Sequence, residues 1–239
     1  MISKESPRKI WIVTLFAAGM AFLETVIVVL QRMLYYPQGF SFPLNPNIQP
    51  WFYNMELARE MFTIIMLATI GYLAGKRAIE RFGYFIYAFA IWDIFYYIWL
   101  KTMINWPASL MTWDLLFLMP LPWIGPVLAP IICSATMIAF HLIIVEAEDR
   151  GKKTKINTKE LMMLVAGSAI ILYTWLKDFA QIIINGGFLK EFTTLLTNPE
   201  FMNIVSKFNP TSYNWPAFML GEALIILAII LYYKRNKRK

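Results

Sequence analysis

The stretch IWIVTLFAAGMAFLETVIVVL, residues Ile10–Leu30, contains one charged side chain, Glu24, in 21 consecutive residues. The hydrocarbon core of a bilayer is about 30 Å thick, and a helix needs about 20 apolar residues to cross it. This segment therefore predicts a transmembrane helix. It is longer than the apolar part of a secretory signal peptide, and no small-residue cleavage motif follows it.

Similar segments recur along the chain of 239 residues, of which 59% are hydrophobic and 15% charged. Soluble domains contain about 45–50% apolar and about 25% charged residues, so one water-soluble core cannot bury this surplus. Lipid-facing backbone must satisfy its own hydrogen bonds, which favours helices. We predict an all-α fold, a single transmembrane domain over residues 1–239 built as a six-helix bundle, with spans at about Ile10–Tyr35, Met55–Ala74, Phe82–Ile104, Trp123–Val145, Leu161–Ile184 and Trp215–Tyr233.

The positions of lysine and arginine predict the orientation. Of the 22 basic residues, 16 lie in the N-terminal tail, the loops after the second and fourth spans, and the C-terminal tail. Cytoplasmic segments carry such an excess. We therefore expect a multi-pass protein of the cytoplasmic (inner) membrane with both termini inside. The net charge of +7 does not indicate nucleic-acid binding, because the basic residues form short clusters between spans instead of one basic face.

The loops on the other side are apolar. The first, YYPQGFSFPLNPNIQPWFYN (Tyr35–Asn54), has four prolines and no charged residue, and the third covers Asn105–Trp123. We expect both to be re-entrant or interfacial segments that cap the bundle. Within the third loop we expect a short helix between Pro107 and Pro120. One or two amphipathic helices are expected in Phe188–Phe208.

Ionisable side chains inside apolar spans are costly, and each is a functional hypothesis. Five spans and the third loop each place one carboxylate at mid-membrane or in the outer half. One hypothesis is a polar pocket that faces outward. The other is a structural network in which Arg32, Arg59 and Lys101 neutralise the acids and fix the helix register. The candidate pocket residues are Glu24, Arg32, Arg59, Glu60, Asp93, Asp114, Asp178 and Glu222.

The residue types also limit the chemistry. The chain has one histidine, His141, which we interpret as a hydrogen-bonded structural residue, and one cysteine, Cys133, which we interpret as a small core side chain. This excludes bis-histidine haem, histidine-rich di-iron or copper sites, and thiolate metal clusters for this chain alone. No phosphate-binding glycine loop, nucleophile elbow or HExxH motif is present. A carboxylate site for calcium, magnesium or manganese stays open, and the residues assign no cofactor.

Four stretches resemble a group of bacterial multi-pass membrane proteins of unassigned function. They are ETVIVVLQRMLYYPQGFSFPL (Glu24–Leu44), WDIFYY (Trp92–Tyr97), WPASLMTWDLLFLMPLPWIGPVLAP (Trp106–Pro130) and YNWPAFMLG (Tyr213–Gly221). The resemblance implies a bacterial cytoplasmic-membrane protein. It implies no activity, cofactor or site residue.

Three functional classes stay open. The first is a membrane subunit or binding protein of a larger complex, with an outward-facing polar pocket. The second is a small permease or ion-handling protein, against which the missing internal repeat argues. The third is an outer-leaflet enzyme that uses carboxylates and a divalent cation, against which the missing nucleophile motif argues. We favour the first class, with the lipid bilayer and other membrane subunits as the expected partners.

Overall fold

The computed structural model describes residues 5–45, 47–119, 121–150, 154–190, 195 and 198–237. Within them the chain forms seven helices and two short strands. Their bounds are α1 Glu5–Tyr35, α2 Pro50–Ala74, α3 Ala78–Ile104, β1 Trp113–Phe117, β2 Trp123–Pro126, α4 Leu128–Asp149, α5 Thr158–Asn185, α6 Pro199–Val205 and α7 Trp215–Lys237. All of these helices except α6 are long and apolar enough to cross a membrane. The prediction of a polytopic, six-helix membrane protein is confirmed.

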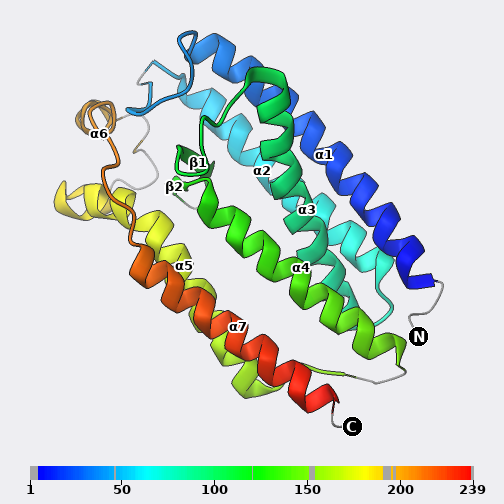
Figure 1. Ribbon diagram of the computed structural model, residues 1–239. Coiled ribbons are helices and arrows are strands. Elements are labelled where there is room, and N and C mark those ends of the chain that lie inside the picture. Colours follow the sequence, from blue (N-terminus) through cyan, green and yellow to red (C-terminus); the bar gives the residue numbers. More distant parts are fainter. Residues whose placement is uncertain are drawn as a thin grey trace.

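Helix α3 is the central helix of the bundle. It packs against α1, α2 and α4, and half of its most apolar window is buried, whereas the other spans bury a third or less. Helices α5 and α7 form a separate pair that meets the rest through α4 and β2. Both termini lie at one end of the bundle, and the β-hairpin and α6 lie toward the other (Figure 1). We call these the terminal end and the hairpin end.

Close backbone contact joins α5 to α7. A Cβ atom on Gly167 would lie 2.7 Å from the carbonyl oxygen of Gly221, and one on Gly221 would lie 2.8 Å from that of Gly167. Lipid tails are as apolar as leucine, so helices in a bilayer associate through close packing more than through the hydrophobic effect. These two glycines therefore set the distance between the helices of this pair.

The terminal end holds matched ion pairs. Arg77 lies 2.6 Å from Glu148, which joins the start of α3 to the end of α4. Arg235 lies 2.8 Å from Glu160, which joins α7 to the start of α5. Glu160 also completes a capping box with Asn157 at the start of α5. At the terminal end, Glu148 and Glu160 are thus each paired with an arginine.

The outer surface of the bundle is apolar. Leu23, Leu34, Leu73 and Met162 are each more than 60% exposed. Side chains of this kind cover only small patches of a water-soluble protein, whereas here they extend along several spans. This is the surface expected for helices in contact with lipid.

The third loop is where the sequence prediction was wrong. Instead of a short helix between Pro107 and Pro120, strands β1 and β2 form an antiparallel hairpin in which Asp114 pairs with Gly125. The fourth span consequently begins at Leu128 and not at Trp123. Prolines lack the N–H that a helix interior needs, and aromatic and branched residues suit a pleated strand. The bundle covers the hairpin on its inner face, where Asp114 and Gly125 are both buried.

The first loop folds back over the hairpin end. The backbone N–H of Asn45 donates to the Tyr36 hydroxyl at 2.9 Å, and the Asn45 amide donates to the Tyr35 carbonyl at 2.8 Å. In the fifth loop, α6 buries Phe201 and Val205 against the end of α5. One short helix therefore forms within Phe188–Phe208, where residues 191–194, 196 and 197 lie outside the described residues.

Candidate functional site: a polar cavity at the hairpin end

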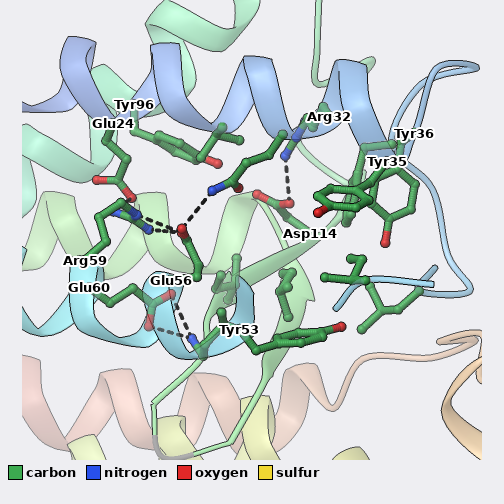
Figure 2. Close-up of a pocket in the computed structure, with 18 of the residues that line it drawn as sticks. Glu24, Arg32, Tyr35, Tyr36, Tyr53, Glu56, Arg59, Glu60, Tyr96 and Asp114 are labelled. Carbon is green, nitrogen blue, oxygen red and sulfur yellow. Dashed lines mark hydrogen bonds and ion pairs between the residues drawn. The ribbon is translucent and has the colours of Figure 1, made fainter. Parts of the chain in front are cut away.

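A cavity with about 130 Å³ of free space lies at the hairpin end, which we call the hairpin-end cavity. Helices α1, α2 and α3, strand β1 and the loop after α1 contribute its walls, and Figure 2 shows their polar side chains converging on it. The central position of α3 explains this arrangement, because α1 and α2 both pack against it and bring their polar residues to one place.

Arg59 organises the first group of charges. Its guanidinium lies 2.8 Å from the carboxylate of Glu24 and also pairs with Glu56 three residues earlier on α2. The indole N–H of Trp92 donates to Glu24 at 2.5 Å, and the Gln31 amide donates to Glu56 at 2.7 Å. These contacts tie α1, α2 and α3 together, which is what the structural-network hypothesis expects for Glu24 and Arg59.

Arg32 and Asp114 form the second group. The guanidinium of Arg32 lies 3.1 Å from Asp114, to which the Tyr97 hydroxyl donates at 3.2 Å. The flat face of Arg32 lies 3.8 Å from the Trp106 ring centre and 4.6 Å from that of Phe40, in cation–π geometry. Burial raises the pKa of the Asp114 carboxyl to about 6, although Arg32 and Tyr97 both favour its ionised form.

Glu60 and Asp93 are held differently. Both carboxylate oxygens of Glu60 accept from the Leu118 backbone N–H at 3.0 Å, and Asp93 accepts from the Ser134 hydroxyl at 2.8 Å. In the part of the chain that the structure describes, neither residue forms an ion pair within 4.0 Å. These two carboxyls are thus held by neutral donors alone.

The cavity is therefore acidic and aromatic. Five carboxyls line it against two guanidinium groups, and eight aromatic rings complete its walls. Four of the rings, those of Tyr35, Tyr36, Tyr53 and Tyr96, are labelled in Figure 2. Burial raises the pKa of the Tyr36 phenol, which keeps this rim residue neutral. Aromatic faces carry partial negative charge, so rings and carboxyls together favour a cation.

The structure brings six of the eight candidate residues to this cavity, namely Glu24, Arg32, Arg59, Glu60, Asp93 and Asp114. The other two lie elsewhere. Asp178 lies 3.7 Å from its neighbour Lys177 on α5, and Glu222 lines a second cavity deeper in the bundle. Lys101 neutralises none of the acids to which the network hypothesis assigned it, because its ammonium group donates to the Pro107 carbonyl at 3.0 Å.

Glu56 and the four tyrosines belong to the cavity and were not among the candidates. Glu56 lies three and four residues before Arg59 and Glu60, and this spacing places it on the same face of a helix. That spacing is the signal that could have identified it from the sequence. His141 lines neither cavity and is fully buried between the rings of Tyr84 and Tyr87. Neither of its ring nitrogens has a hydrogen-bond partner among the described residues, so ring packing and not the expected hydrogen bond holds it.

Among the described residues, no group of three or more histidine, cysteine, aspartate or glutamate side chains is placed to hold a metal ion. Comparisons of the chain with models of known protein families, with curated proteins and with solved structures find no match. A functional proposal for this chain therefore rests on the geometry of the cavity.

Proposed function

We propose that this chain is a binding protein or binding subunit of the bacterial cytoplasmic membrane, whose hairpin-end cavity faces outward and takes up a small organic cation. The observation that carries the proposal is the charge of the cavity, where Glu60 and Asp93 have only neutral hydrogen-bond donors. A carboxylate that has no ion-pair partner inside an apolar bundle is costly, and a bound cation offsets that cost.

The ion pairs around the cavity give the proposed site its shape. Arg59 and Arg32 hold Glu24, Glu56 and Asp114 and connect the three helices with the hairpin. A site built on such paired residues is rigid before the ligand arrives, which lowers the entropic cost of binding. The aromatic walls then favour an ammonium group with alkyl substituents over a metal ion. An alkylammonium group is weakly hydrated and can contact the rings directly, whereas a metal ion would have to give up tightly bound water.

The proposal predicts saturable binding of tetramethylammonium, a compact organic cation, to the purified protein in lipid nanodiscs. We expect Glu60→Gln and Asp93→Asn each to weaken binding about tenfold or more, because each removes a charge and keeps the shape. Isothermal titration calorimetry measures the affinity, and thermal unfolding checks that each variant is folded. Tenfold corresponds to about 1.4 kcal/mol, a typical effect for one charged contact.

The matched control is Asp178→Asn, the same carboxyl-to-amide change on a residue that lines neither cavity. It should bind tetramethylammonium as the wild type does. The neutral analogue neopentyl alcohol should bind neither protein. If the three variants Asp93→Asn, Glu60→Gln and Asp178→Asn bind the cation equally well, the proposed binding site is wrong. If, in addition, only the first two have lower thermal stability, the result supports the structural-network hypothesis.

Transport is the second candidate function. The observation that favours it is the position of Asp93, which lines both the hairpin-end cavity and the deeper cavity that contains Glu222. Uptake of labelled tetramethylammonium into proteoliposomes, driven by an inside-negative potential, would distinguish a permease from a binding protein.

A further inference from the structure

A second cavity, of about 310 Å³, lies between α3 and α4 on one side and α5 and α7 on the other. We call it the mid-bundle cavity. Most of its wall is apolar or aromatic, including Phe89, Ile171 and Leu172, and the rings of Trp123 and Trp175 stack on each other with centres 5.4 Å apart. It lies where the α5–α7 pair meets the rest of the bundle.

Two carboxyls face this apolar space. Asp93 accepts from Ser134, and one oxygen of Glu222 accepts from Thr136 at 2.9 Å. The other oxygen of Glu222, Oε1, is buried and has no hydrogen-bond partner among the described residues. The Cys133 thiol lies within hydrogen-bond reach of Glu222, but a thiol is a weak donor and leaves the carboxyl without a strong one.

The charge of the mid-bundle cavity is unbalanced. Among the described residues its lining includes both acids and no lysine, arginine or histidine. Glu222 is 1% exposed, so bulk solvent does not reach it. Leaving a carboxyl oxygen without a partner inside an apolar bundle is costly, which points to a ligand that brings a donor or a positive charge.

The cavity opens toward the lipid. Ser168 lines it and is itself exposed. On α5 this serine follows Val165 by three residues and precedes Leu172 by four, so the three share one helix face. Val165 is 60% exposed on the apolar outer surface of a candidate span. A ligand that is dissolved in the bilayer therefore has direct access to this cavity.

We propose that the mid-bundle cavity binds a lipophilic amine that enters from the bilayer, with its ammonium group at Glu222 and Asp93 and its hydrocarbon part against the tryptophans. The apolar wall binds the hydrocarbon, and the two carboxyls select the charged head group. The site differs from the one proposed at the hairpin end in Glu222 and the α5–α7 pair, which do not line that cavity, whereas Asp93 lines both.

The probe for this site is 1-aminoadamantane, a compact and lipophilic ammonium ion, and its neutral counterpart is 1-adamantanol. Binding to the protein in nanodiscs changes the fluorescence of Trp123 and Trp175, which gives the affinity. We expect the amine to bind at least tenfold more tightly than the alcohol. Glu222→Gln should remove that preference, whereas Asp178→Asn, which lines neither cavity, should retain it.

A second variant keeps the test decisive if Glu222→Gln does not fold. Ser168→Phe fills the opening on the lipid side and leaves both carboxyls in place, so it should abolish binding of amine and alcohol alike. Equal affinities of amine and alcohol, or wild-type binding by both variants, would overturn the proposal and indicate a cavity filled by lipid chains.

Competition separates the two proposed sites. Tetramethylammonium is too polar for the mid-bundle cavity, so Glu222→Gln should leave its affinity unchanged. Because Asp93 lines both cavities, saturating tetramethylammonium should weaken 1-aminoadamantane binding only in part. If it displaces the amine completely and Glu222→Gln weakens both cations alike, the two cations share one site and the inference about the mid-bundle cavity fails. If tetramethylammonium does not bind at all but the amine does, the proposed function fails and this inference stands.

Discussion

Asp114 lies in the hairpin, outside the candidate spans, and its surroundings determine how stability responds to pH. Its folded-state pKa of about 6 lies above the ordinary value of 3.8. The folded protein therefore binds this proton more tightly than the unfolded chain does. The resulting stabilisation is complete below pH 4 and is lost as the pH rises through about 6. The shift corresponds to about 3 kcal/mol at most.

Asp114→Asn removes this ionisation and is the variant that tests it. We expect wild type and variant to unfold at similar temperatures at pH 4, and the wild type to lose stability relative to the variant between pH 4 and 7. Thermal unfolding in detergent across this range measures the difference. The opposite result would be a wild type whose unfolding temperature rises relative to that of the variant as the pH rises. It would mean that the ion pair with Arg32 outweighs the cost of burying the Asp114 carboxylate.

At the same scale, the sequence gives an expected depth for each charged residue but not the direction in which its side chain points. Depth follows from the fixed rise of a helix, about 1.5 Å per residue. Direction depends on how each helix is rotated, and packing sets that rotation. Glu222 and Asp178 were therefore predicted beside Glu24, yet α7 turns Glu222 toward α4 and α5 leaves Asp178 beside Lys177.

Among the elements, the α5–α7 pair offers the clearest test of packing. Gly167→Ala and Gly221→Ala each place a Cβ atom less than 3.0 Å from backbone of the facing helix, which cannot move aside as a flexible side chain does. We expect each to destabilise the protein by about 1–3 kcal/mol, the usual cost of overpacking, and to lower the unfolding temperature.

The matched control is Gly19→Ala in α1, where an added Cβ meets nothing within 4 Å. Alanine is a better helix former than glycine by about 1 kcal/mol, so this variant should be as stable as the wild type or slightly more so. If all three variants unfold at the same temperature as the wild type, close glycine packing does not hold α5 and α7 together.

Elements differ in how well the sequence predicted them, and length is the reason. A span of more than 20 residues averages over many side chains, so its apolar character is unmistakable. Strand β1 has five residues and β2 has four, and both are apolar enough to read as part of a neighbouring helix. Only their pairing, between segments that flank prolines, makes them strands, and tertiary packing decides that pairing.

At the scale of the whole molecule, both chain ends lie at one end of the bundle (Figure 1), and the basic loops predict which side of the membrane that end faces. The end of α4, the start of α5 and the C-terminal end of α7 lie at the terminal end (Figure 1). In the sequence, the loop between α4 and α5 and the C-terminal tail carry ten of the 16 clustered basic residues. Because cytoplasmic loops retain such residues, we expect the terminal end inside and the hairpin end outside.

Reporter fusions test this arrangement. Alkaline phosphatase is active only outside the cytoplasm, and green fluorescent protein fluoresces when fused on the inside. We expect fluorescence for fusions after Lys239 and within Arg150–Lys159, and phosphatase activity for fusions within Asn198–Asn209. Replacing the basic residues of the loop between α4 and α5 with glutamine should weaken the preference of this loop for the cytoplasmic side, because its positive charges create that preference. A phosphatase-active C-terminus would turn the hairpin-end cavity toward the cytoplasm, so its cation would have to come from inside the cell. The access proposed for the mid-bundle cavity does not depend on orientation, because Ser168 in its lining lies along α5 between the two ends of the bundle.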